Sequence, residues 1–159
     1  MWDRSGGLRR LILGAALLLA GSCDPLPDPD TLPDEILQAE LGLTVQDRVY
    51  RVALTGSSPA GTTERADPVA ISIEPGSYVE FVTTDWLIHE VIFEADSVTR
   101  AQWSFLESTD QTASPPLINR ESRYVLTFEG APSGRYPYLI EGNGPAGRGL
   151  IIVIPPEDR

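Results

Sequence analysis

From residue 48 onward, apolar side chains recur at every second position, which is the period of a half-buried β-strand. In "RVYRVALT", Tyr50, Val52 and Leu54 share one face. Six further segments follow the pattern, namely "VAISI", "YVEFVTT", "IHEVIFEA", "RYVLTFE", "RYPYLIE" and "GLIIVI", with turn sequences such as "EPGS", "EGAPSG" and "GNGPAG" between them. A weaker segment, "AQWSFLES", lies among them. Seven or eight short strands without a long amphipathic helix predict an all-β sandwich.

Residues 1–23 have the composition of an export signal. "MWDRSGGLRR" carries three arginines, "LILGAALLLA" is an apolar run of ten residues, and "GSC" follows at once. The apolar run is shorter than the roughly 20 residues that a membrane-spanning helix needs. We therefore predict a signal peptide over residues 1–23, and an uncleaved membrane helix is the alternative.

Cys23 is the only cysteine of the chain and stands directly after "LAGS". This arrangement resembles the lipobox of bacterial lipoproteins, in which the cysteine becomes the lipid-modified first residue of the mature chain. The resemblance implies a lipid anchor at Cys23 and a location on the periplasmic or extracytoplasmic face of a bacterial membrane. An ordinary signal peptide with a free cysteine is the alternative, although a lone cysteine in an exported protein has no disulfide partner.

The charge of the chain limits its partners. Removal of residues 1–23 takes away three arginines and one aspartate and leaves 9 basic and 22 acidic side chains, a net charge of −13. Such a chain repels phosphate groups, so we expect no nucleic-acid partner. It also has no excess of basic side chains for anionic lipid, which leaves a covalent lipid as the expected membrane attachment.

Residues 24–44 are expected to connect the anchor to the domain. "DPLPDPDTLPDE", from Asp24 to Glu35, combines four prolines with repeated acidic residues, so we predict an extended, unpacked tether, with disordered filler as the alternative. The next stretch, "EILQAELGL", is read as a short helix or an irregular lead-in. The folded domain is placed at residues 45–159.

The order of motifs along the domain resembles that of the cupredoxin family. "ISIEPGSYVEFVTTDWLIHEVIFE" resembles its proline-glycine turn, valine-rich strand and histidine-opened strand. "SPPLINRESRYVLTF" resembles its serine-proline-leucine loop, and "APSGRYPYLIEGNGPAGRGLIIV" resembles its closing hairpin. The likeness covers residues 48–155 and implies a cupredoxin-like Greek-key β-sandwich.

The same resemblance places the copper ligands of the family on this sequence. His89 stands at the first histidine position, Ile140 at the cysteine position and Asn143 at the second histidine position, and residues 144–148 offer no methionine. Besides Cys23 and Met1 the chain has no cysteine or methionine, and His89 is its only histidine. A type 1 copper site needs two imidazoles and a thiolate. We therefore predict no copper, no other cofactor and no electron transfer through a type 1 site.

The sequence does not predict a different metal site or a catalytic role at His89. Glu141 is expected nearby, but one imidazole with carboxylates falls short of the three or four ligands of a typical zinc site. The alternative is a partly buried histidine that shares a face with Val91 and Phe93 and bonds to backbone or to Asn143. Because the only histidine faces the core, a serine nucleophile has no base, and we predict that the chain is not an enzyme.

The loop end of the sandwich is the expected site of interaction, since apolar and aromatic loop residues on a rigid scaffold are common in interfaces. The candidate interface residues are Trp86, Leu87, Pro115, Pro116, Asn143, Pro145 and Arg148. The resulting hypothesis is a membrane-anchored, non-catalytic interaction or structural subunit of a membrane complex, one concerned with electron transfer being an example. The alternative is a binding module that uses the emptied copper pocket for a small ligand or an envelope polymer.

Overall fold

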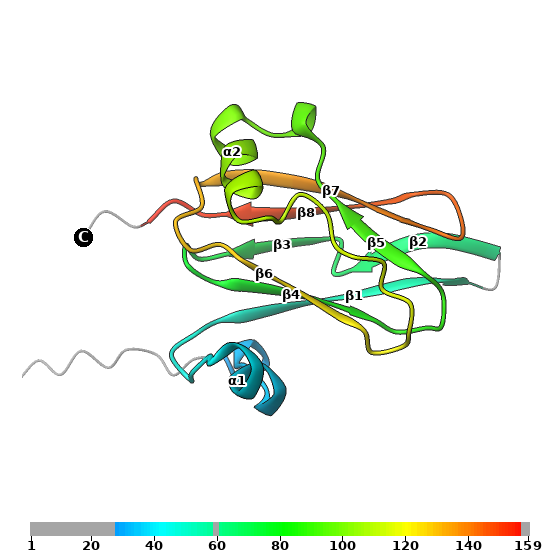
Figure 1. The fold of residues 1–159 in the computed structure, drawn as a ribbon, viewed down its shortest axis with the longest axis horizontal. Helices are drawn as coiled ribbons and strands as arrows, with labels where there is room; N and C mark the ends of the chain where they lie inside the picture. The colour runs from blue at the N-terminus through cyan, green and yellow to red at the C-terminus, as the bar shows by residue number, and fades with distance from the viewer. Residues whose placement is uncertain (1–27, 59–60, 157–159) are drawn as a thin grey trace, which may run out of the picture.

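The computed structural model describes residues 28–58 and 61–156, which form two four-stranded sheets packed face to face (Figure 1). The first sheet has the order β2-β1-β4-β6 and the second the order β3-β8-β7-β5. The strands are β1 (Val49–Ser58), β2 (Gly61–Asp67), β3 (Ala70–Ile73), β4 (Tyr78–Thr83), β5 (His89–Ile92), β6 (Arg123–Thr127), β7 (Gly134–Gly142) and β8 (Gly147–Val153). The helices are η1 (Pro29–Thr31), α1 (Glu35–Leu41), η2 (Ala95–Ser97) and α2 (Arg100–Ser108). The predicted all-β sandwich is confirmed.

The core lies between the two sheets and is filled by the alternating residues that the sequence pattern indicates. Tyr136, Tyr138 and Ile140 of β7 are buried, while the residues between them are partly exposed. Edge-to-face contacts join the Tyr138 ring to Phe81 of the first sheet at 5.1 Å and to Phe93 at 6.0 Å. These aromatic contacts connect the two sheets through the centre of the core.

The hydroxyl of Tyr138 is buried without a hydrogen-bond partner among residues 28–58 and 61–156. Burial also raises the pKa of Tyr138 above its ordinary value. An unpaired buried hydroxyl destabilises the folded state relative to water, where it is solvated.

We predict that Tyr138→Phe raises the free energy of unfolding by up to about 1 kcal/mol, measured by urea denaturation. Tyr136→Phe is the matched control, because the Tyr136 hydroxyl donates a 2.6 Å hydrogen bond to the Pro132 carbonyl. That control should lose about 1 kcal/mol. A loss for Tyr138→Phe as large as that for Tyr136→Phe would contradict the prediction.

The segment "AQWSFLES" is a helix rather than a weak strand. It lies within α2, which begins at a capping box between Thr99 and Gln102. Trp103 and Phe105 give an alternation that imitates a strand, but Gln102 and Leu106, four residues apart, form the buried face. Phe105 packs against Phe128 at 6.2 Å, and α2 lies beside β7 in Figure 1.

One strand, β2, was not predicted, because its sequence "GTTERAD" is polar. It pairs antiparallel with β1, with Leu54 opposite Ala66. Only two of its residues, Glu64 and Ala66, are buried. The hairpin of β1 and β2 thus carries an acidic side chain into the sandwich, at the end far from α1 in Figure 1.

Residues 28–34, which we call the lead-in from here on, pack against the outer face of the first sheet. The prediction of an unpacked tether is therefore wrong for these residues. Arg51 of β1 donates to the carbonyls of Asp30 and Leu32 at 3.1 and 3.0 Å. Buried Glu80 of β4 accepts from Arg51 and from Arg123, both at 2.9 Å. Residues 24–27 lie outside the described part of the chain.

Helix α1 is fixed to the same face by polar and apolar contacts. Asp34 caps the helix and accepts a 2.6 Å hydrogen bond from Arg123, while Leu37 is buried with Leu43 and Val49. Burial acts to raise the pKa of Asp34, but the Leu37 N–H and the Arg123 guanidinium outweigh it and hold the pKa below its usual value. The contacts of Asp34 with the helix and with Arg123 are therefore fully formed at neutral pH and weaken as acid protonates Asp34.

Within residues 28–58 and 61–156, no helix is long and apolar enough to cross a membrane. The expected signal over residues 1–23 and the expected lipid at Cys23 lie outside these ranges. Both stay predictions.

Candidate functional site

His89 is the first residue of β5 and is completely buried. It pairs with Gly142 of β7 on one side, and on the other it exchanges backbone hydrogen bonds of 3.1 and 2.8 Å with Leu117. Val91 and Phe93 are buried on the same face of the chain, as the alternation predicts. The imidazole therefore lies inside the sandwich, where the β4–β5 loop leads into β5.

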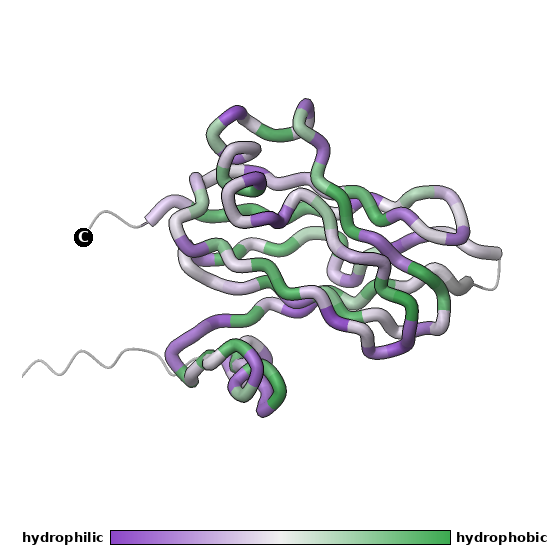
Figure 2. The backbone as a smooth tube through the Cα atoms, viewed as in Figure 1, coloured by the Kyte–Doolittle hydropathy of each residue, from purple (hydrophilic) through white to green (hydrophobic). Residues whose placement is uncertain are grey.

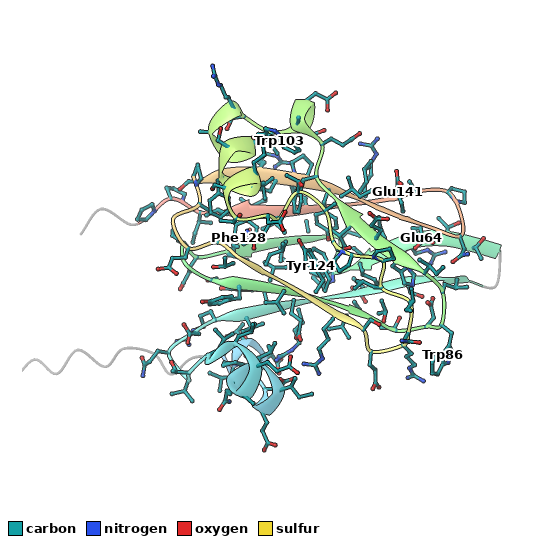
Figure 3. The ribbon with its side chains drawn as sticks, in the orientation of Figure 1. Glu64, Trp86, Trp103, Tyr124, Phe128 and Glu141 are labelled. Carbon is teal, nitrogen blue, oxygen red and sulfur yellow. The ribbon has the colours of Figure 1, made fainter. Side chains whose placement is uncertain are left out.

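Each nitrogen of the His89 ring contacts a carboxylate. Nδ1 lies 2.6 Å from Glu64 Oε2, and Nε2 lies 2.8 Å from Asp85 Oδ1. The expectation that the ring bonds to backbone or to Asn143 is therefore wrong. Glu141 is not a partner either, because it is exposed and pairs with Glu90 across the strands. Figure 3 labels Glu64 and Glu141.

Asp85 connects the histidine to the loop between β4 and β5. Its Oδ1 accepts from the Leu87 N–H at 3.0 Å, and its Oδ2 accepts from the Gly56 N–H at 2.8 Å and the Thr55 hydroxyl at 3.1 Å. The Leu87 contact closes an Asx-type turn around Trp86. The turn is thus held to β1 and to His89 by a single carboxylate.

Glu64 lies close to two glycines, with its side chain against Gly142 and its backbone against Gly147. Its Oε1 accepts from the Asn143 N–H at 3.1 Å. A Cβ on Gly142 would lie 2.5 Å from this oxygen and 2.3 Å from the Ile88 carbonyl, and a Cβ on Gly147 would lie 2.3 Å from the Glu64 carbonyl. Gly142, the last residue of β7, and Gly147, the first of β8, do not adopt the left-handed conformation. They are required for the close approach of β2 rather than for the turn that the sequence suggested.

The other two ligand positions of a copper site hold groups of a different kind. Ile140 is fully buried opposite Val91 and is part of the apolar core. Asn143 uses its side-chain oxygen to accept from the Ile88 N–H at 3.0 Å, which joins the β7–β8 loop to the β4–β5 loop. Neither side chain offers a soft or imidazole ligand to a metal.

Comparison with known proteins identifies the fold to which this arrangement of strands corresponds. No protein-family model and no curated protein matches the chain. Among solved structures, the copper-containing nitrite reductase NirK from Thermus scotoductus SA-01 is 23% identical with a TM-score of 0.50, over 72% of this chain and 24% of that one. The chain has a cupredoxin-like fold.

Two small proteins are also similar. A pseudoazurin from Sinorhizobium meliloti is 22% identical over 69% of this chain and 76% of its own, with a TM-score of 0.45. A purple cupredoxin from Nitrosopumilus maritimus is 19% identical over 66% of this chain and 99% of its own, with a TM-score of 0.44. The chain spans about a quarter of the nitrite reductase, and these identities concern the fold alone.

The donor set of this cupredoxin-like domain does not fit type 1 copper. Such a site takes two imidazoles and a thiolate, whereas the positions here hold His89, Ile140 and Asn143. Both nitrogens of the single imidazole already face carboxylates. Within the described ranges, no three histidine, cysteine or acidic side chains form a group that could hold a metal ion.

We predict that addition of Cu²⁺ to the purified protein produces no intense absorption band in the red part of the visible spectrum. The reason is that the band requires a copper–thiolate bond, and Cys23 is the only thiol of the chain. Absorption spectroscopy during a copper titration measures this directly. An intense band that also persists in Cys23→Ser would contradict the prediction.

The candidate interface residues fall into four places. Trp86 is 74% exposed, next to half-buried Leu87. Pro115 and Pro116 are exposed in the segment that runs along β5 to the bridge at Leu117. Asn143 and Pro145 lie on the β7–β8 loop beside Glu64, whereas Arg148 lines a small cavity with Glu94 and Pro137.

The structure adds two residues to this surface, Ile88 and Ile118, which are 47% and 57% exposed. They flank the paired residues His89 and Leu117 and so lie opposite each other on neighbouring segments. We call Trp86, Leu87, Ile88 and Ile118 the apolar loop end. Figure 2 shows hydrophobic stretches in the β4–β5 loop and in the segment before β6 at this end.

Proposed function

We propose that the chain is a non-catalytic, membrane-anchored cupredoxin-like domain that serves as an interaction or structural subunit of an extracytoplasmic membrane complex. In this proposal a lipid on Cys23 attaches the protein, and the apolar loop end binds the partner. A complex concerned with electron transfer is one setting. The observation that carries the proposal is the 74% exposure of Trp86 on a loop whose next two amides, those of Leu87 and Ile88, are hydrogen-bonded.

The fixed backbone of the loop supports a docking role. Asp85 accepts from the Leu87 N–H, and Asn143 accepts from the Ile88 N–H. The indole of Trp86 is thus exposed although the segment that carries it is ordered by neighbouring strands. A rigid aromatic side chain loses little conformational entropy on binding, and tryptophan is enriched among residues that dominate interface energies.

The position of this surface is compatible with the proposed anchor. The lead-in and α1 cover the outer face of the first sheet, where Leu37, Leu43 and Val49 are buried. Figure 3 shows Trp86 at the end of the sandwich that lies away from α1. A partner at the apolar loop end would therefore not compete with the packed lead-in.

The alternative of a ligand module in the emptied copper pocket has less support. The side chains of His89, Ile140 and Glu64 are buried at the positions that such a ligand would need. Ligand sites usually combine a preformed concave space with a few convergent polar groups. Here the convergent polar groups bind one another.

The proposal is tested by solubilising membranes gently and measuring the native size of the particle that contains the protein. We expect a large assembly with the natural chain and loss of that assembly with Trp86→Ala, since truncation of a central tryptophan weakens binding by about 30-fold or more. Leu41→Ala is the matched control, because Leu41 is 51% exposed on α1. Migration of the natural chain as a monomer in every mild detergent would refute the proposal.

A further inference from the structure

The contacts of the His89 ring require more hydrogens than a neutral imidazole has. Glu64 Oε2 and Asp85 Oδ1 lie 2.6 and 2.8 Å from the two ring nitrogens. Ionised carboxylates only accept hydrogen bonds, and a neutral imidazole donates from one nitrogen alone. Without an additional proton, one of these short contacts would place a nitrogen lone pair against a carboxylate oxygen.

The partners of the two carboxylates indicate where the additional proton resides. Asp85 accepts from Gly56, Thr55 and Leu87, and Glu64 accepts from Asn143, so the oxygens of both carboxylates already act as hydrogen-bond acceptors. Imidazole is ordinarily a stronger base than a carboxylate. The proton therefore belongs on the ring, which then donates from both nitrogens.

We propose that His89 is a buried imidazolium cation, and that the Glu64–His89–Asp85 cluster is a proton-dependent cross-link that orders the loop end in place of a metal ion. The cluster joins β1 through Gly56, β2 through Glu64, the β4–β5 loop through Asp85, β5 through His89 and the β7–β8 loop through Asn143. Five segments meet at one cation.

Removal of the proton has a specific structural consequence. The titratable side chains that contact the ring are Glu64 from β2 and Asp85 from the β4–β5 loop, while β7 presents Gly142 and the segment before β6 presents the Leu117 backbone. Asp85 is the more exposed carboxylate, with 14% of its side chain accessible. A neutral ring would release Asp85 toward solvent, and the turn around Trp86 would loosen with it.

The single histidine of the chain makes the proton count measurable. We suggest labelling the protein with ¹⁵N-histidine, without a polyhistidine tag, and recording its ring signals in detergent at neutral pH. We expect two slowly exchanging N–H protons on one ring at neutral pH. A ring with a single N–H at neutral pH would overturn the proposal.

Charge-removing variants test the cross-link. Asp85→Asn and Glu64→Gln keep the size of each side chain, and we expect loss of one ring proton and at least tenfold faster hydrogen exchange at the Leu87 amide. Glu141→Gln is the control, because this exposed carboxylate lies one residue from Gly142 on β7. Unchanged ring protons in both variants would refute the proposed cross-link.

The role of the cross-link in docking rests on the proposed function, whereas the charge of the His89 ring does not depend on it. The proton count is measured on the isolated protein. An imidazolium ring in a protein that binds no partner would refute only the proposed function. A neutral ring in a protein that does bind a partner would refute only the cation.

Discussion

Glu64→Ala is expected to lower the free energy of unfolding by about 3–5 kcal/mol, the range found when one partner of a buried ion pair is removed. The variant leaves the buried His89 ring without the 2.6 Å contact at Nδ1 and leaves the Asn143 N–H without its acceptor. Urea denaturation followed by far-ultraviolet circular dichroism measures the change.

Glu141→Ala is the control for this variant. Glu141 is exposed on β7, where it faces Glu90 across the strand pair rather than His89. A surface substitution of this kind should alter the free energy of unfolding by no more than about 0.5 kcal/mol. Equal losses for Glu64→Ala and Glu141→Ala would show that the buried cluster does not stabilise the fold.

The second large effect is expected for Gly142→Ala. A Cβ at this position would lie 2.3 Å from the Ile88 carbonyl and 2.5 Å from Glu64 Oε1, so the β7–β8 loop, the β4–β5 loop or β2 must move. Gly142 itself is exposed, but its added Cβ would point at backbone and at the buried Glu64 side chain. Overpacking of this kind lowers the free energy of unfolding by about 1–3 kcal/mol and sometimes more. We expect a value at the upper end, because one of the atoms to be displaced is backbone.

Gly76→Ala separates this steric effect from the loss of a glycine as such. Gly76 has a φ of +83° and no neighbouring atom within 4 Å of an added Cβ, so its substitution reports backbone conformation alone. Gly142→Ala should be the more destabilising change. In a Glu64→Ala background its effect should become smaller, because the two positions are in contact and their effects are not additive.

The sequence predicts that two of the copper-ligand positions, His89 and Ile140, lie inside the sandwich. Alternation along β5 places His89 with Val91 and Phe93 in the core, and the two-residue period of β7 buries Ile140. These are local properties of single strands. The all-β fold follows from the same periodicity, repeated in seven segments and separated by turn residues.

The partners of His89 could not be predicted in the same way. Glu64 lies 25 residues before it, on a strand whose polar sequence hides the two residues that face inward. Asp85 is four residues before His89 in a loop, where no periodicity indicates direction. The one available signal is chemical, since a buried histidine in a chain with 23 acidic residues requires polar partners.

For the lead-in, the sequence predicts an unpacked segment, whereas the structure shows a packed one. Prolines and like charges disfavour regular packing, yet Arg51 and Arg123 on the outer face of the first sheet bind this segment. Their partner Glu80 is fully buried beneath the two arginines. Attraction between residues far apart in the chain thus outweighs the local preference for an extended segment.

The contacts among Glu64, His89 and Asp85 also bear on how the protein matures. Glu64, His89 and Asp85, which join the segments of the loop end, all belong to the same chain. If His89 is the cation that we propose, folding alone completes this end of the domain, without delivery of a metal. Chelating agents should leave its stability unchanged, and starvation for copper should leave its abundance unchanged.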